Sequence, residues 1–228
     1  MQTRCPDPRC NNEFKLPEVA ADKRKHYLSN CPECGIKAAF RTMEALQAIE
    51  IAHRKKVDKN AIAGGPPWED ARVPSLSVLV EDVRSLWNVG SIFRTADGAG
   101  FDKLFLSGIT GTPPRKEVEK VSLGAENTVS WEYEINPLSV IISLREKGVS
   151  IVGLEVSESS VLLSEAIAEK KLSKPLCLVL GNEVSGLSPQ VLSNCSIVCH
   201  LPMHGMKESL NVAVAFGISA YLIKEALG

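Results

Sequence analysis

Two loops near the C-terminus carry the residues best suited to holding a ligand. Each follows a short apolar run, 176–180 or 196–201, of the kind that forms a strand buried on both faces. The first loop begins with Gly181-Asn182-Glu183, and the second ends in Ser209-Leu210-Asn211, just before the apolar, proline-free stretch 212–227. Because such loops meet at the carboxyl edge of an α/β sheet, we expect both loops and the following helix to form one ligand site.

A third polar group opens an upstream helix, which we predict over 88–98. Asn88 can cap this helix, and Arg94 lies nearly two turns further along, free to project from the same edge. In the last loop, Ser209 is placed to cap the final helix and Asn211 to point from its first turn. Each of these residues, taken alone, is also compatible with an ordinary helix cap or an exposed side chain.

Four cysteines near the start form two close pairs, Cys5 with Cys10 and Cys31 with Cys34. Two pairs separated by about 15–20 residues have the spacing of a four-cysteine zinc ribbon. Two disulfides or unrelated thiols are the alternatives, and disulfides are disfavoured in a chain with seven cysteines and no secretory signal. So small a segment has few large apolar residues, so we expect it to depend on structural zinc to fold.

The elements that must position these residues alternate between strand and helix from residue 76 onward. We predict strands over 77–80, 104–107, 131–133, 150–155, 176–180 and 196–201, and helices over 88–98, 120–126, 137–146, 162–169 and 212–227. This alternation predicts the α/β class, with a parallel sheet and helices on both faces.

A Gly- and Pro-rich stretch, 60–74, follows a predicted helix over 43–59 and marks the most plausible domain boundary. We therefore divide the chain into a zinc-ribbon-like module (1–40), a helix and linker (41–74) and the α/β domain (75–228).

Three motifs, in order, resemble those of the SpoU (TrmH-type) RNA ribose methyltransferases of the SPOUT superfamily. They are Asn88 to Arg94 (NVGSIFR), Gly181-Asn182-Glu183 with Gly186, and Pro202 to Val212 (PMHGMKESLNV). The resemblance covers roughly residues 75–227, and three spaced motifs are far more specific than any one alone.

The resemblance implies transfer of a methyl group from S-adenosylmethionine to a ribose 2′-hydroxyl of structured RNA, either tRNA or rRNA. It implies a C-terminal trefoil knot and a homodimer, with the last helix as a plausible interface through Phe216, Tyr221 and Leu222. The residues that match catalytic positions of the family are Arg94, Asn88, Glu183, Ser209 and Asn211. Those that match cofactor-binding positions are Leu180, Gly181, Leu201, Met203, Gly205 and Leu210.

Charge is distributed unevenly, although the formal net charge is −1. The first 60 residues hold 12 Lys and Arg against 8 Asp and Glu, so phosphate contacts are expected in this part of the chain. No apolar stretch approaches the roughly 18 residues of a membrane span, and no secretory signal is recognised. We therefore expect a cytoplasmic protein without a membrane partner.

Two other functions remain open for the same residues. One is a knotted methyltransferase that acts on a base, and the other is a catalytically idle RNA-binding adaptor with the same fold. Cys195, Cys199 and His200 are interpreted as strand residues rather than metal ligands, and His204 is given no role.

Overall fold

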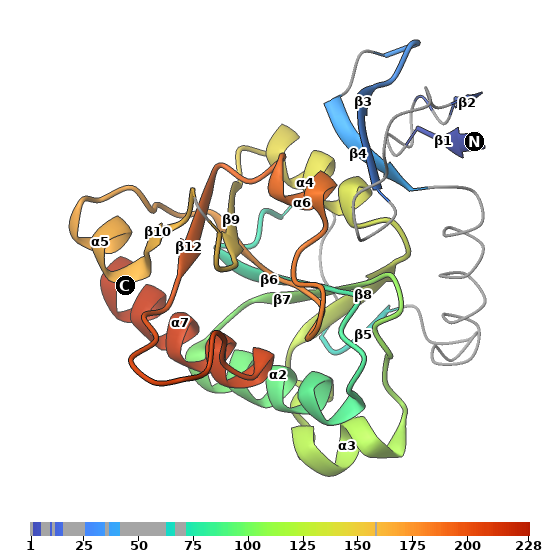
Figure 1. Cartoon of the computed structure of the whole chain (residues 1–228). Coiled ribbons are helices and arrows are strands. Elements are labelled where there is room, and N and C mark those ends of the chain that lie inside the picture. The colour runs from blue at the N-terminus through green and yellow to red at the C-terminus, as the bar shows by residue number, and fades with distance from the viewer. Residues whose placement is uncertain are drawn as a thin grey trace.

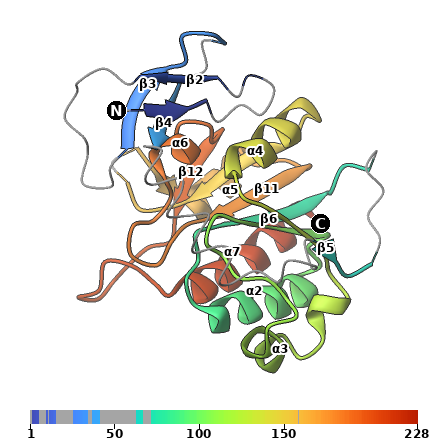
Figure 2. The same cartoon turned by 90° about the vertical axis from the view of Figure 1, so that its right-hand side faces the viewer.

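The computed structural model describes residues 2–5, 10, 12–15, 26–34, 37–41, 63–66, 72–157 and 159–228. Within these residues the largest unit is an eight-stranded sheet with helices on both faces (Figures 1 and 2). The strand order is β10-β12-β9-β11-β6-β7-β8-β5, and every neighbouring pair is parallel except β8 with β5. The strands are β5 (Ala63–Gly64), β6 (Leu76–Glu81), β7 (Lys103–Ser107), β8 (Ser130–Glu134), β9 (Ser150–Leu154), β10 (Val161–Leu162), β11 (Leu176–Leu180) and β12 (Ile197–His200).

The central strands are buried on both faces, as their continuous apolar runs predict. In β6, Val78 and Val80 pack into one core while Leu79, between them, packs into a second core on the opposite face. β11 behaves in the same way, with Leu178 in the first core and Val179 in the second. This alternation follows from the two-residue repeat of a strand, and it requires a helical layer on each side.

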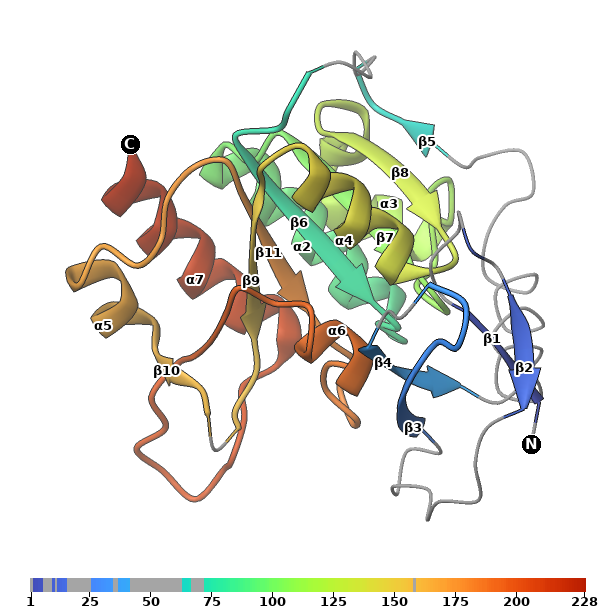
Figure 3. The ribbon, with the colours of Figure 1, turned by 90° about the horizontal axis from the view of Figure 1, so that it is seen from above.

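Two groups of helices supply these layers, as the view in Figure 3 also shows. The first core contains residues of α2, α3, α5 and α7, and the second contains residues of α4 and α6. The helices are α2 (Leu86–Ala99), α3 (Lys116–Ser122), the 3-10 turn η1 (Ala125–Asn127), α4 (Pro137–Glu146), α5 (Leu163–Ala168), α6 (Pro189–Leu192) and α7 (Val212–Leu227). The predicted α/β class with a mainly parallel sheet and helices on both faces is therefore confirmed.

Two predicted helix caps were wrong. Ser85, not Asn88, is the N-cap of α2, and its Oγ accepts a hydrogen bond from the Asn88 amide (3.3 Å). The helix begins earlier because Leu86 packs against the first core, which moves the cap outward by three residues. Asn211, not Ser209, caps α7, since its Oδ1 accepts from the amides of the first turn.

The helix predicted over 120–126 is also corrected, because α3 begins at Lys116 and ends at Ser122. Leu123 takes a left-handed conformation (φ 51°), which stops the helix. The segment after it continues as the short 3-10 turn η1.

The N-terminal part contains two pairs of antiparallel strands. β1 (Gln2–Arg4) pairs with β2 (Glu13–Lys15), and β3 (His26–Asn30) pairs with β4 (Lys37–Arg41). β3 and β4 contact α6 of the main unit (Figure 3). The stretch treated as helix and linker contributes β5 to the sheet edge, while the helix predicted over 43–59 lies outside the described residues. In the part of the chain that is described, no helix is long and apolar enough to cross a membrane.

Candidate active site

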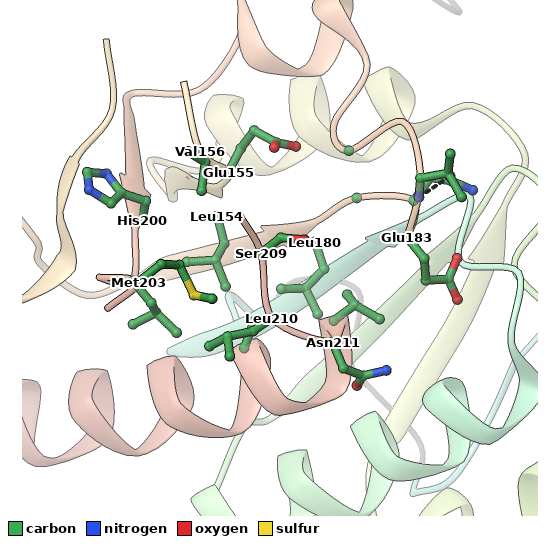
Figure 4. A pocket seen from close by; sticks show the side chains of 17 residues that line it. Leu154, Glu155, Val156, Leu180, Glu183, His200, Met203, Ser209, Leu210 and Asn211 are labelled. Carbon is green, nitrogen blue, oxygen red and sulfur yellow. Dashed lines mark hydrogen bonds between the residues drawn. The ribbon is translucent and has the colours of Figure 1, made fainter. Parts of the chain in front are cut away.

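A cavity of about 220 Å³ opens where β9, β11 and β12 end and α7 begins (Figure 4). The strand-end loops and the start of α7 form its wall, so the expected convergence of both loops and the last helix is observed. The side chains that line it are apolar on one side and polar around Glu183 and Asn211. The lining residues already singled out from the sequence are Leu180, Gly181, Glu183, Leu201, Met203, Ser209, Leu210 and Asn211.

The loop after β11 is folded tightly against itself. Asn182 Oδ1 accepts hydrogen bonds from the amides of Val184 (2.9 Å) and Ser185 (3.0 Å), while its Nδ2 donates to the Asp82 carbonyl (2.7 Å). Gly181 is required here, because an added Cβ would lie 2.3 Å from the Gly186 carbonyl carbon. The glycine therefore permits close backbone packing that fixes the direction in which the next residue leaves the strand.

Glu183 joins this loop to the start of α2. One carboxylate oxygen accepts from the Arg84 amide (2.9 Å), and the other accepts from the Ser85 amide (3.0 Å) and from Asn88 Nδ2 (3.0 Å). Partial burial opposes ionisation, but the hydrogen bonds from Arg84 and Ser85, with Asn88, outweigh it and lower the pKa of Glu183. The carboxylate is thus held ionised at neutral pH and in one orientation.

Asn211 connects the third motif to the first. Its Nδ2 donates to Asn88 Oδ1 (3.1 Å), while its Oδ1 accepts from the amides of Ala213 (3.0 Å) and Val214 (3.3 Å). Because one side chain both caps α7 and bonds Asn88, the amide orientation of Asn211 is fixed. Asn88, Glu183 and Asn211 therefore form one hydrogen-bonded chain along the rim of the cavity.

Three residues of the predicted site do not line the cavity. Asn88 is joined to it through Glu183 and Asn211, and the other two lie elsewhere. Arg94 is exposed on α2 and is not among the residues that line the cavity. Gly205 is exposed in the loop before α7 and does not line it either; an added Cβ there would meet nothing within 4 Å. The spacing of the motifs does not predict where Arg94 and Gly205 lie, because it does not specify which way a loop or a helix face is oriented.

Two carboxylates that sequence reasoning missed hold the far end of the Glu183 loop. Glu155, just after β9, accepts from the Leu187 amide (2.7 Å), and the buried Glu81 accepts from the Ser188 amide (2.9 Å). Glu155 also lines the cavity. The sequence did contain a signal for both glutamates, because each stands at the carboxyl end of a predicted strand, where site residues are expected.

The four N-terminal cysteines come together as predicted. Their Sγ atoms all lie within 4.8 Å of one another, with Cys5 to Cys34 at 3.6 Å and Cys10 to Cys31 at 3.7 Å. Burial opposes ionisation of Cys31, but hydrogen bonds from the backbone of Cys34 and Glu33 lower its pKa to about 7. This cluster has the donor chemistry of a tetrahedral metal site, in which sulfurs are about 3.8 Å apart when each metal–sulfur bond is about 2.3 Å.

The remaining thiols form no second metal cluster among the described residues. Cys177 and Cys199 are buried in the sheet, where burial raises the pKa of each thiol, to about 12 and about 11. Cys195 Sγ donates to the Val191 carbonyl (3.3 Å), and His200 Nδ1 contacts Ser160 Oγ (2.9 Å). His200 nevertheless lines the cavity, which its position in an apolar run did not predict.

The exposed side of α7 carries an apolar stripe made of Val214, Ile218, Tyr221 and Leu222. These positions recur at helical spacing and so share one face. Phe216, expected at an interface, is instead fully buried and packs edge-to-face on Phe101 (5.4 Å between ring centroids).

Comparison with known proteins agrees with this geometry. Residues 75–221 match the profile described as the SpoU rRNA Methylase family. The tRNA (guanosine(18)-2′-O)-methyltransferase of Aquifex aeolicus is 32% identical over 67% of this chain and 70% of that protein. The 23S rRNA (guanosine-2′-O-)-methyltransferase RlmB of Neisseria meningitidis is 26% identical over 93% of this chain and 86% of that protein.

Solved structures give the same grouping. An AdoMet-bound rRNA methyltransferase from Sinorhizobium meliloti has a TM-score of 0.62 and 29% identity, over 68% of this chain and 57% of that one. The TrmH/SpoU tRNA modifying enzyme of A. aeolicus has a TM-score of 0.58 and 26% identity, over 81% and 84% of the two chains. A TrmH-family structure from Porphyromonas gingivalis is matched over 61% of its length, so this chain spans less than two thirds of some of these proteins.

Proposed function

We propose that this chain, which belongs to the SpoU rRNA Methylase family, methylates a ribose 2′-hydroxyl of structured RNA with S-adenosylmethionine as the methyl donor. The observation that carries the proposal is the hydrogen-bonded chain of Asn88, Glu183 and Asn211 at the rim of the cavity. These residues come from all three motifs, which lie far apart in the sequence. Relatives named for tRNA and for rRNA both support an RNA substrate.

The cavity suits a nucleoside joined to a charged chain. Leu180, Leu201 and Leu210 offer an apolar wall for adenine, and the Gly181 backbone permits close approach, while Met203 also contributes to the lining. When bound, S-adenosylmethionine supplies an activated methyl group on a sulfonium. The polar residues Glu183 and Asn211 stand on the side of the cavity toward α2, and Ser209 lies between them and the apolar wall (Figure 4).

The residues of this chain then position the acceptor. Asn88 and Asn211 orient the ribose at the rim, and Glu183 holds Asn88 through a charge-assisted hydrogen bond. Alignment of the hydroxyl oxygen with the methyl group can supply several kcal/mol of the barrier, on the order of 7–11 kcal/mol at best. Arginine is a poor base, with an unperturbed pKa above about 12, so Arg94 orients the hydroxyl while an RNA phosphate accepts the proton.

Arg94 can act at a cavity that it does not line if two chains share the site. We propose a homodimer in which Arg94 of one chain completes the cavity of the other. The exposed apolar stripe Val214, Ile218, Tyr221 and Leu222 supports this, because α7 packs beside α2, which carries Arg94. The family resemblance supports it as well.

The four-cysteine cluster is proposed to hold one structural zinc ion. Its sulfur separations of 3.6 and 3.7 Å fit a tetrahedral thiolate site. Zinc bound there would connect the two N-terminal pairs of antiparallel strands. We assign this module (1–40) to RNA binding, because the basic excess of the chain lies in its first quarter.

Three further parts of the proposal rest on the family or the cysteine content. They are the C-terminal trefoil knot, the boundary between the linker (41–74) and the methyltransferase domain (75–228), and a cytoplasmic location. All seven cysteines are free in the structure, which fits a reducing compartment.

The decisive experiment maps ribose 2′-O-methyl groups and base methyl groups in tRNA and rRNA from cells with and without the gene. Loss of one site, restored by the purified protein with S-adenosylmethionine, is the expected result. A missing methyl on a base instead of a ribose would assign a base methyltransferase. No change in any RNA, together with retained RNA binding, would assign an idle adaptor.

A further inference from the structure

Glu155 is a cavity residue for which neither the motifs nor the family assignment provides a role. It follows β9 directly, and its neighbour Leu154 pairs with Leu180 on β11. Because Leu180 and Gly181 form part of the cavity wall, Glu155 stands beside Gly181 at the carboxyl edge of the sheet. Its side chain is half-buried and lines the cavity (Figure 4).

The carboxylate is held in a fixed place. Oε2 accepts a hydrogen bond from the Leu187 amide (2.7 Å). Gly186, in the left-handed region (φ 63°), leaves room for this contact, since an added Cβ would lie 2.0 Å from Oε2. The loop that carries Glu183 is therefore wrapped around one oxygen of Glu155.

The second oxygen, Oε1, has no hydrogen-bond partner among the described residues. Glu155 is half-buried, and Oε1 is not among the enclosed polar atoms that lack a partner, so a hydrogen-bond donor from water or from a ligand can reach it. Because Glu155 lines the cavity, a bound ligand is placed to supply it.

We propose that Glu155 accepts hydrogen bonds from the ribose hydroxyls of the methyl donor's adenosine. This inference rests on the proposed function, and it adds a recognition residue that the three motifs lack. Adenine fits the apolar wall of Leu201 and Leu210, while the reacting end faces Glu183 and Asn211, on the side toward α2. The ribose joins these two ends, and its adjacent hydroxyls offer the donors that a carboxylate oxygen accepts.

The test compares ligands and variants by calorimetry, without RNA or turnover. The ligands are S-adenosylhomocysteine, 5′-methylthioadenosine, which lacks the amino-acid part, and the 2′,3′-dideoxy form of methylthioadenosine. The variant Glu155→Gln keeps an oxygen for the Leu187 amide but loses the charge. Glu165→Gln, exposed on α5, is the matched control.

We expect Glu155→Gln to weaken binding of the first two ligands by about 10- to 100-fold, the range of a charged hydrogen bond. It should leave binding of the dideoxy ligand unchanged, and Glu165→Gln should change none of the three. Equal weakening for the dideoxy ligand, or no weakening at all, would overturn the inference. An effect confined to S-adenosylhomocysteine would assign Glu155 to the ammonium group instead.

A measurement on the unaltered protein guards against misfolding of the variant. The parent chain should bind methylthioadenosine at least tenfold more tightly than its dideoxy form, by the same estimate. Equal affinities would refute a role for the hydroxyls whatever the variant does. If the parent binds no adenosine compound, the proposed function itself fails, which is a different result from normal binding that is insensitive to Glu155.

Discussion

Asn211 Nδ2 donates a 3.1 Å hydrogen bond to Asn88 Oδ1, although 123 positions separate the two residues in the chain. The bond joins the start of α7 to the start of α2, and Glu183 extends it through Asn88. Both asparagine side chains are thereby oriented by protein partners before any substrate binds. Preorganised polar groups of this kind act on a transition state without reorganising first.

Asn211 has two tasks that substitution can separate. Asn211→Asp keeps the oxygen that caps α7 but places an oxygen opposite Asn88 Oδ1, so we expect near-normal stability and at least a tenfold loss of methyl transfer. Asn211→Ala should in addition lose about 1 kcal/mol of unfolding free energy. Denaturant melts and a methyl-transfer assay measure the two effects. As the control, Asn136→Ala, which removes the N-cap of α4, should lower stability without impairing transfer.

Gly181 and Gly205 make a matched pair of glycine substitutions. Gly181→Ala would force a Cβ to 2.3 Å from Gly186 and 2.4 Å from the Leu187 amide nitrogen, whereas Gly205→Ala meets nothing within 4 Å. We expect Gly181→Ala to lose about 1–3 kcal/mol of stability and most affinity for S-adenosylhomocysteine. Gly205→Ala should retain both in thermal melts and calorimetry. A strong loss of S-adenosylhomocysteine affinity in Gly205→Ala would show that Gly205 does belong to the cofactor site.

Glu183 should make stability depend on pH in the acid range. Its folded-state pKa lies below the ordinary value of 4.5, so its stabilising contribution is present above that value. The contribution is lost as pH falls through the lowered pKa, because the protonated acid accepts the amide hydrogen bonds less well. Denaturation of the parent and of Glu183→Gln should therefore differ at neutral pH and converge below about pH 4. A gap in unfolding free energy that stays constant down to pH 2 would contradict this.

Arg94 should affect turnover more than donor binding. Since it is exposed and outside the cavity, Arg94→Ala should bind S-adenosylhomocysteine normally and lose methyl transfer by about 100-fold or more. Arg145→Ala, exposed on α4 where Arg145 bonds Asn194, is the control.

A mixed dimer tests whether Arg94 acts across the interface. One chain carries Arg94→Ala and the other Asn211→Ala, so a shared site has one intact combination of arginine and cavity. Recovery of activity on mixing supports the shared site. Turnover by Arg94→Ala at the parent rate would instead reject the assigned role altogether.

Metal content tests the cysteine cluster. We expect one zinc per purified chain, lost in Cys31→Ser and kept in Cys195→Ser, which lies outside the cluster. Removal of zinc by a chelator should lower the melting temperature, because Cys5 and Cys31 pack with Leu187 and Val191 in the second core. Parent protein free of zinc and iron would eliminate the metal site.

Much of the fold could be predicted from apolar patterning. The strand 176–180 and the helices 137–146 and 212–227 have the bounds predicted for them, because each combines a clear periodicity with turn or capping residues at its ends. Short elements with weak patterns were not predicted, including β5, β10 and α6. A strand of two residues, such as β5, exists only because a neighbouring strand is available to pair with it.

For the site, the sequence by itself determined which residue types are present and in what order, including the four cysteines and the three motifs. These are local properties, set by the identities of neighbouring residues. Only the tertiary structure decided that Asn88, Glu183 and Asn211 touch, that Arg94 lies outside the cavity of its own chain, and that Glu155 lines it. Those facts depend on how strands pair and how helix faces turn toward the sheet, and burial of apolar surface across the whole chain sets both.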